Sequence, residues 1–326
     1  MFVSGNNAYV ASNGSNALEI IDVANPAVPV HKGSLSDGSG GALLSGPRSV
    51  YIYGNQAFVA SYFSNALEII NITNPSAPIH SGSLLNGAGG AFIIFPTSVC
   101  VFGNYAFVTN ASQGLEIVDI SNPTAPFHVS KILSGTALLT NPLSVYAVGT
   151  YAYIASSGSN ALEIVDVTNP STPSHKGSLT NGTGGALLNS PAYSVSVSGN
   201  YCYVASYGNN ALEIVDVTNP TAPVQQSSLS SGTGGASLNG PYSVYVSGNY
   251  AYVAGWSSSS LEIVDITNPA APLHKASLLN GTGGALLDHP ISVYVSGNYA
   301  YVAANVGNAL EIVDGTNPAA PFHKGC

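Results

Sequence analysis

The chain has 326 residues, of which only 6% are charged, and its six lysines and arginines face fifteen aspartates and glutamates, a net charge of −9. So few cations cannot neutralise a phosphate backbone or an anionic membrane surface, so we expect neither nucleic acid nor such a membrane as a partner. No apolar run approaches the roughly 18 residues of a spanning helix, and we expect no membrane insertion.

One repeat accounts for the whole chain. A motif that begins Leu-Glu-Ile recurs every 47 to 50 residues, and a fixed period of this size decides the architecture. We therefore expect a single domain over residues 1–326, made of seven repeats of about 49 residues. The motifs begin at Leu18, Leu67, Leu115, Leu162, Leu212, Leu261 and Leu310.

The sixth repeat shows the expected elements in chain order. Residues Ser243–Gly248 form an apolar-rich run that ends in Gly-Asn, and Tyr250–Ala254 follows at once, which predicts a β-hairpin. After a short polar loop, Leu261–Ile266 predicts a third strand. A Thr-Asn-Pro-Ala-Ala-Pro turn comes next, where proline fixes φ and keeps its predecessor extended. A fourth, shorter strand is expected at Leu273–Leu278.

Four strands in each period, without helical periodicity, predict an all-β fold: a seven-bladed β-propeller with four antiparallel strands per blade. We name the strands A to D from the hub outward. The chain starts within strand A of the first repeat and stops within strand D of the seventh, so each repeat is expected to form one whole blade. The amino terminus lacks the basic start and apolar stretch of a signal peptide.

The motif resembles a known family. Leu-Glu-Ile-Val-Asp, followed by Val or Ile, Thr or Ser and Asn-Pro-x-x-Pro, and preceded by Gly-Asn-Tyr-Ala-Tyr-Val-Ala, is similar to the LVIVD repeat of bacterial and archaeal propellers in all seven copies. The resemblance implies the propeller fold and a secreted or cell-surface location rather than an activity. The connection from strand D to the next strand A departs from that repeat by an extra Gly-Thr-Gly-Gly-Ala-Leu-Leu segment.

Thirteen of the fifteen acidic residues belong to the repeat motif, so we interpret them as structural. The aspartate precedes the Asn-Pro turn, where a short carboxylate can accept hydrogen bonds from loop amides, and Asn71 can keep that role in the second repeat. A ring of seven glutamates that binds a cation is the alternative, disfavoured because strand C lies away from the hub. The residues are Glu19, Glu68, Glu116, Glu163, Glu213, Glu262 and Glu311, with Asp22, Asp119, Asp166, Asp216, Asp265 and Asp314.

Six of the seven histidines share one position on the predicted strand D, where the fifth repeat has Gln225. One imidazole per blade cannot supply the three or four ligands of a zinc site, so no metal is expected. Asp288 and His289 form a titratable pair outside the repeat pattern, and without a nucleophile we expect no catalysis there. The repeated histidines are His31, His80, His128, His175, His274 and His323.

The three cysteines follow no metal or disulfide spacing. Cys100 and Cys202 replace strand residues and are expected to be packed core thiols. Cys326 ends the chain, and the sequence leaves open a reactive end or an intermolecular link.

The repeats differ most in the loop between strands B and C, which carries four large aromatic residues: Tyr62, Phe63, Tyr207 and Trp256. Strand alternation puts these loops on the same face as the connections from D to A with their Leu-Leu pairs. Loops on a rigid scaffold commonly carry binding, so these four are candidate ligand-binding residues. Alternatively the leucines pack against the blade ends and the aromatics are ordinary surface residues. The pairs are Leu43–Leu44, Leu187–Leu188 and Leu286–Leu287.

The preferred functional hypothesis is a non-catalytic, secreted or cell-surface module that contacts another protein or a second copy of itself through this loop face, because exposed apolar patches commonly mark such contacts. The alternative is a glycan-binding propeller in which Trp256, Tyr207 and Tyr62 stack on sugar rings. A lactonase or lyase propeller is less expected, because it needs acids or histidines that converge on the hub. No catalytic residue and no cofactor is predicted.

Overall fold

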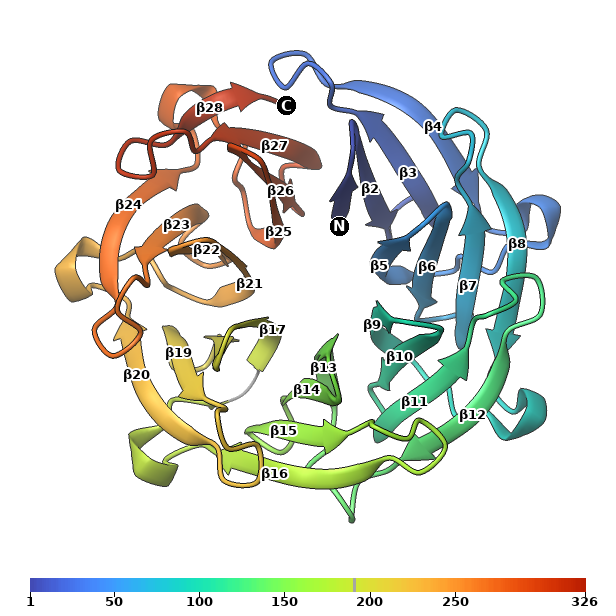
Figure 1. Cartoon of the computed structure of the whole chain (residues 1–326). Helices are drawn as coiled ribbons and strands as arrows, with labels where there is room; N and C mark the ends of the chain where they lie inside the picture. Colours follow the sequence, from blue (N-terminus) through green and yellow to red (C-terminus); the bar gives the residue numbers. More distant parts are fainter. Residues whose placement is uncertain (190–191) are drawn as a thin grey trace. The chain divides into compact units, whose positions relative to one another are not determined.

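The computed structural model describes residues 1–189 and 192–326, and its strands form seven four-stranded antiparallel sheets (Figure 1). In each sheet the hydrogen-bonded order follows the chain from strand A to strand D. The protein is therefore an all-β seven-bladed β-propeller, as the repeat predicted. The four strands predicted for the sixth blade are confirmed to within two residues at either end.

The strand bounds follow the repeat. Blades one to three contain β1 (Phe2–Ser4), β2 (Asn7–Ser12), β3 (Ala17–Asp22), β4 (Val30–Ser36); β5 (Pro47–Tyr53), β6 (Gln56–Ser61), β7 (Ala66–Asn71), β8 (Ile79–Leu85); β9 (Pro96–Phe102), β10 (Tyr105–Asn110), β11 (Gly114–Asp119) and β12 (Phe127–Ile132). Blades four and five contain β13 (Pro142–Val148), β14 (Tyr151–Ser156), β15 (Ala161–Asp166), β16 (Ser174–Thr180); β17 (Ala192–Ser198), β18 (Tyr201–Ser206), β19 (Ala211–Asp216) and β20 (Val224–Ser230). Blades six and seven contain β21 (Pro241–Ser247), β22 (Tyr250–Gly255), β23 (Ser260–Asp265), β24 (Leu273–Leu279); β25 (Pro290–Ser296), β26 (Tyr299–Ala304), β27 (Ala309–Asp314) and β28 (Phe322–Gly325).

The chain divides into two compact units. The second and third blades lie wholly in the first unit, and the fifth, sixth and seventh blades lie wholly in the second. The expectation of a single domain over residues 1–326 stays a prediction. The first unit comprises Met1–Ala24, Val30–Ile154 and Glu163–Lys176, and the second comprises Asn25–Pro29, Ala155–Leu162 and Gly177–Cys326.

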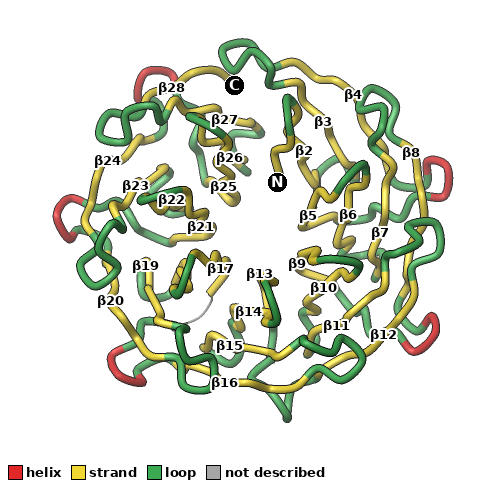
Figure 2. The backbone as a smooth tube through the Cα atoms, viewed as in Figure 1, coloured by secondary structure: helices red, strands yellow, loops and turns green. Residues whose placement is uncertain are grey.

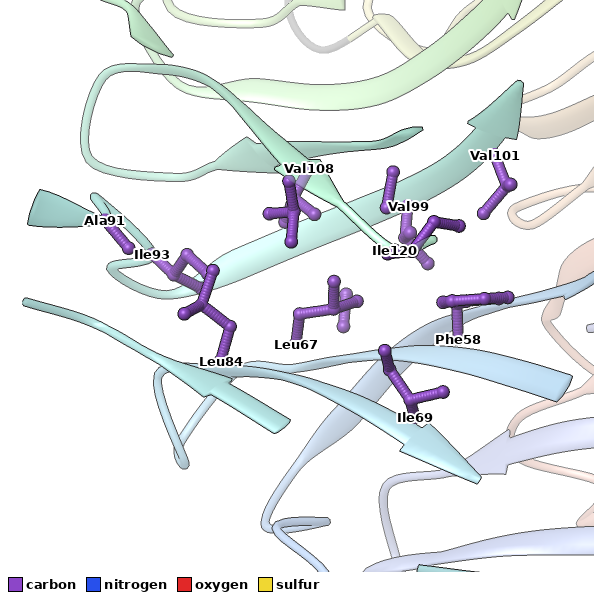
Figure 3. Close-up of a cluster of buried hydrophobic side chains, with 13 residues drawn as sticks. Phe58, Leu67, Ile69, Leu84, Ala91, Ile93, Val99, Val101, Val108 and Ile120 are labelled. Carbon is purple, nitrogen blue, oxygen red and sulfur yellow. The ribbon is translucent and has the colours of Figure 1, made fainter. Parts of the chain in front are cut away.

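The core between the second and third blades, within the first unit, shows how neighbouring repeats pack (Figure 3). Phe58 of β6 and Leu67 of β7 are buried in one cluster with Val99 of β9 and Val108 of β10. Burying one side chain of this size contributes roughly 1.5–3 kcal/mol. Strands B and C are covered by apolar contacts on both faces, which explains why their sequences are apolar at consecutive positions rather than at alternate ones.

In the described part of the chain, five of the six connections from strand D to the next strand A contain a short 3-10 turn followed by extended chain, and Figure 2 shows the turns in red. The connection between β12 and β13 is the exception. The second leucine of each pair is fully buried, as Leu44 and Leu287 illustrate, whereas Leu43 is half-buried and Leu286 is exposed. The interpretation that the leucines pack against the blade ends is confirmed for the second of each pair. The turns are η1 (Ser39–Gly41), η2 (Ala88–Gly90), η3 (Thr183–Gly185), η4 (Thr233–Gly235) and η5 (Thr282–Gly284).

Among the residues that the structure describes, no helix has the length and apolar character needed to cross a bilayer.

Candidate functional site

The repeated aspartate caps the turn that follows strand C. Asp265 Oδ1 accepts hydrogen bonds from the Thr267 hydroxyl at 2.6 Å and from the Thr267 backbone N–H at 3.0 Å. These bonds hold the pKa of Asp265 below its usual range, because they favour the ionised carboxylate. In the second blade Asn71 Oδ1 accepts the Thr73 N–H at 2.9 Å, so the predicted structural role is confirmed for both residue types.

A β-bulge brings the repeated histidine beside the repeated glutamate. In the sixth blade the register between β23 and β24 shifts after Ile263. Val264 therefore pairs with His274 and not with Lys275. Because alternate residues of a strand point to one face and paired residues share a face, His274 lies on the same face of the sheet as Glu262.

The repeated glutamate is held by two donors from different parts of the chain. In the second blade, His80 Nδ1 donates to Glu68 Oε1 at 2.6 Å, and the backbone N–H of Leu43, in the connection that enters the blade, donates to Oε2 at 3.2 Å. The carboxylate thus joins strand C to strand D of its own blade and to the connection that enters the blade. The same pair recurs as Glu116 with His128, Glu163 with His175, Glu262 with His274 and Glu311 with His323.

The pairing of this glutamate with the histidine was not predicted from the sequence, although their constant spacing indicates it. Both residues recur 12 positions apart in each of these blades. In the first blade His31 Nε2 contacts Glu19 at 3.2 Å, and both side chains are partly exposed.

The fifth blade lacks the imidazole. Gln225 takes its place, and the Leu187 N–H still donates to Glu213 Oε2 at 3.1 Å, but Glu213 Oε1 is buried without a hydrogen-bond partner. Burial raises the pKa of Glu213 to about 8, because the carboxylate has lost its water. Burial also raises the pKa of Glu262, but there a backbone amide and His274 oppose the rise. Glu213 is therefore the repeat glutamate with the least support for its charge.

Two of the three thiols are packed in the core, as predicted. Cys100 and Cys202 are buried and unbonded to other cysteines, and burial raises the pKa of Cys100 to about 11 and that of Cys202 further. Cys326 is exposed. Within the described part of the chain, no three side chains of His, Cys, Asp or Glu come together in a way that could hold a metal ion.

The second unit carries a continuous group of aromatic side chains, here called the Trp256 cluster. The rings of Tyr193 and Tyr242 stack with centroids 4.1 Å apart, and Tyr193 meets the edge of Tyr207 at 5.7 Å. Tyr207 lies 6.3 Å from Trp256, and Trp256 meets His289 at 4.4 Å in an edge-to-face contact. The cluster therefore joins the fifth and sixth blades to the residue that enters the seventh.

The first unit carries a smaller group, here called the Arg48 cluster. The guanidinium carbon of Arg48 lies 3.5 Å from the ring centroid of Tyr62. Phe95 stacks on Tyr62 at 4.9 Å, and Phe63 meets Tyr62 edge-on at 5.1 Å. The side chains of Phe63 and Phe95 are 59% and 41% exposed, so part of this group faces solvent.

Apart from Phe63, both clusters are built from the same three positions of the repeat. The first residue of the B–C loop is Tyr62, Tyr207 or Trp256. These loops are hydrogen-bonded to the connection that enters the same blade, as when the Trp256 N–H donates to the Gly240 carbonyl at 2.8 Å. The second residue of strand A is Arg48, Tyr193 or Tyr242, and the residue before the strand A proline is Phe95 or His289.

The last of these positions is strained. Phe95 and His289 have φ angles of 52° and 51°, in the left-handed region, where other repeats have Gly46, Asn141 or Gly240. A side chain in this region costs roughly 1–2 kcal/mol that glycine avoids. Both rings contact the B–C loop aromatic of the preceding blade, and strain of this kind is concentrated at binding sites.

The structure brings the four predicted residues together in two pairs, Tyr62 with Phe63 and Tyr207 with Trp256. The sequence did not identify their neighbours as part of a binding site, although Arg48, Phe95 and His289 each differ from the residues at the same position of other repeats. These neighbours are Arg48, Phe95, Tyr193, Tyr242 and His289.

Comparison with protein families gives one match, to the LVIVD repeat. It covers residues 1–37, 47–86, 97–133, 142–181, 191–230, 242–279 and 290–326. No curated protein matches the sequence at a significant level.

Solved structures similar to this one share little sequence with it. A functionally unknown protein from Desulfotomaculum acetoxidans DSM 771 is 13% identical with a TM-score of 0.72, over 98% of this chain and 94% of that one. A putative 6-phosphogluconolactonase from Bacteroides fragilis NCTC 9343 is 11% identical with a TM-score of 0.73, over 97% and 92%. A protein from Lactobacillus plantarum is 13% identical with a TM-score of 0.76, over 96% and 91%. At these identities the similarity concerns the fold alone.

Proposed function

Because this chain belongs to the LVIVD repeat family and each of its two units carries an aromatic cluster on the B–C loops, we propose that it is a non-catalytic binding propeller whose ligand is a carbohydrate. The Trp256 cluster is the observation that carries this proposal. Aromatic rings with an apolar face and a polar edge suit sugars, which present both C–H faces and hydroxyl groups. Ligand sites combine such rings with a few polar groups that fix orientation.

Polar groups lie at one end of the Trp256 cluster. His289 Nδ1 and Asp288 Oδ1 are 2.6 Å apart, and both side chains are about a third exposed. The exposed Ser257 follows Trp256 directly, and its backbone N–H donates to the Asn239 carbonyl. A carboxylate, an imidazole and a hydroxyl beside the indole can bond several sugar hydroxyls.

The absence of catalysis is part of the same proposal. The His289 ring is hydrogen-bonded to Asp288. The Ser259 hydroxyl accepts a hydrogen bond from the His289 backbone N–H rather than contacting the imidazole. Nucleophilic catalysis needs a hydroxyl or thiol within hydrogen-bond reach of its base. A location outside the cell or on its surface is also proposed, on the strength of the family resemblance.

Replacing Trp256 with alanine is expected to abolish the binding of neutral carbohydrate, because the indole contacts both Tyr207 and His289 and supplies the largest ring of the cluster. Loss of one stacked ring reduces affinity by about 10-fold or more. The measurement is binding to an array of neutral and acidic oligosaccharides, with Leu273→Ala as a matched control, since Leu273 is exposed outside the cluster. An array that stays blank with the unmutated protein contradicts the proposal.

A second candidate function is supported by an exposed apolar residue at the start of strand D. This residue is more than half exposed in six blades, while the fourth blade has Ser174. Exposed apolar residues on an outer strand favour association with a protein or with a second copy. The buried second leucines leave less apolar surface on the loop face, so this strand is the better place for such a contact. The residues are Val30, Ile79, Phe127, Val224, Leu273 and Phe322.

Self-association through strand D has its own test. Changing Leu273 and Phe322 to serine, the residue that the fourth blade carries, is expected to convert oligomers to monomers in sedimentation velocity at increasing protein concentration. If the unmutated protein is a monomer at all concentrations, the hypothesis of self-association is wrong. The proposal of carbohydrate binding does not depend on this result.

A further inference from the structure

We infer that the Arg48 cluster is a separate site for acidic carbohydrate, with Arg48 binding the carboxylate of a uronic acid residue and the exposed faces of Phe63 and Phe95 contacting its ring. The inference rests on the proposed carbohydrate function and goes beyond it, because it assigns the charge of the ligand and places it on residues other than the Trp256 cluster.

Among the described residues, two of the six lysine and arginine side chains, Arg48 and Lys131, lie in no ion pair with a carboxylate, and Lys131 donates instead to a backbone carbonyl. No Asp or Glu oxygen of the described residues lies within 4.0 Å of the Arg48 guanidinium. The chain has six cations in all, and the five lysines have partners close at hand. Lys32, Lys176, Lys275 and Lys324 pair with Asp22, Asp166, Asp265 and Asp314, and Lys131 donates to the Gly90 carbonyl.

The position of Arg48 leaves its hydrogen-bonding edge usable. Its guanidinium lies over the Tyr62 ring at 3.5 Å, and the residue is exposed. A contact with the face of the guanidinium occupies no N–H donor, because the donors lie in its plane. That planar fork matches a carboxylate in two parallel hydrogen bonds, a geometry that lysine cannot supply. Tyr62 thus holds the fork in place for an anion.

Two exposed rings lie beside this cation. Phe95 stacks on Tyr62 while remaining 41% exposed, and its left-handed backbone fixes the direction of the ring. Phe63 meets Tyr62 edge-on and is more exposed still. A carboxylate bonded to Arg48 therefore places the rest of the ligand next to the apolar faces of these two rings. A uronic acid fits this arrangement, because its carboxyl group is attached to a sugar ring that has C–H faces.

The Trp256 cluster lacks the cation at the position that matches Arg48. Tyr193 and Tyr242 occupy the position of Arg48 in the repeat, and Asp288 adjoins the position of Phe95. That cluster therefore has tyrosines in place of the arginine and carries the Asp288 carboxylate, which repels an anionic sugar. One framework of loops thus presents a neutral-sugar site in the second unit and an acidic-sugar site in the first.

The test is isothermal titration of the full chain with trigalacturonate and with galactotriose of the same linkage. Arg48→Gln is expected to lower the affinity for trigalacturonate by about 10- to 100-fold, the range of a charged hydrogen bond, and to leave galactotriose binding unchanged. Arg48→Lys keeps the charge and is expected to restore only part of the affinity. Trp256→Ala is expected to show the reverse pattern, with galactotriose binding lost and trigalacturonate binding kept. Circular dichroism of each variant confirms that the fold is intact.

Trigalacturonate affinity that is unchanged in Arg48→Gln overturns the inference, and galactotriose binding that depends on Trp256 then leaves the proposed function standing. Trigalacturonate binding that depends on Arg48, with no galactotriose binding, supports the inference and removes the role proposed for Trp256. A short peptide that ends in phenylalanine is the third probe. If it binds through Arg48 while trigalacturonate does not, the ligand is a peptide carboxylate and the inference is wrong.

Discussion

Glu213→Gln is expected to stabilise the protein at pH 8 and to leave its stability at pH 4 nearly unchanged. The pKa of Glu213 is about 8 in the folded protein, against an ordinary value of 4.5. Between these two values the unfolded chain releases a proton that the folded chain keeps, so stability falls as the pH rises, by about 1.4 kcal/mol per pH unit and by up to about 5 kcal/mol in all. A glutamine has no proton to keep and removes this loss.

The measurement is urea denaturation at pH 4, 6 and 8, followed by circular dichroism. Gln225→His is expected to act in the same direction at pH 8, because it gives Glu213 Oε1 the donor that five other blades supply. The matched control is Glu262→Gln, which removes a carboxylate that His274 does bond, and it is expected to cost about 1–3 kcal/mol. If the two glutamine variants change stability alike, the argument about the missing histidine is wrong.

Gly82→Ala is expected to destabilise the protein by about 2–3 kcal/mol, the cost of forcing extra volume into a packed contact. A Cβ atom on Gly82 of β8 would lie 2.5 Å from the carbonyl oxygen of Pro123, in the turn after strand C of the third blade. Both partners are backbone, and neither can rotate away. Strand D therefore runs against the turn of the following blade with no space for a methyl group.

The third blade provides the control for this prediction. Ser130 occupies the same repeat position, and its hydroxyl donates to the Pro170 carbonyl at 2.5 Å, so the backbones there are separated by a side chain. Ser130→Ala is expected to cost only about 1 kcal/mol, the value of one hydrogen bond. The free energy of unfolding of both variants is measured by thermal and urea denaturation. If both variants lose the same stability, the close backbone contact at Gly82 does not explain the effect of the substitution.

Most of the fold could be predicted because each repeat carries the same local instructions. The apolar strands and the Asn-Pro turn recur in all seven repeats and the Gly-Asn turn in six, so each copy supports the interpretation of the others. The pairing of Glu262 with His274 could not be predicted, because it depends on the bulge after Ile263. Without that bulge Lys275 would lie on the glutamate face, and strand alternation alone cannot reveal a shift of one residue.

The candidate site could be predicted only in part, for a related reason. Tyr207 and Trp256 stand out because their loop differs between repeats, and a variable loop on a constant scaffold points to binding. Tyr193 and Tyr242 lie in strand A, about 14 residues before those loop residues, where an aromatic residue is typical of any strand. The contact of Tyr193 with the loop residue Tyr207 depends on strand A and the B–C loop meeting at the same end of the fifth blade.

The hydrogen bond from each connection to the next glutamate has a consequence for how such a chain can grow. Leu43 gives its amide to Glu68, and Leu286 gives its amide to Glu311, so each connection between two repeats donates to the glutamate of the repeat that it enters. A duplicated repeat inserted between two others brings both halves of this junction with it. Lengthening or shortening the gene by one copy therefore requires no new polar contact between blades, and copies are free to diverge in their loops while the junction stays the same.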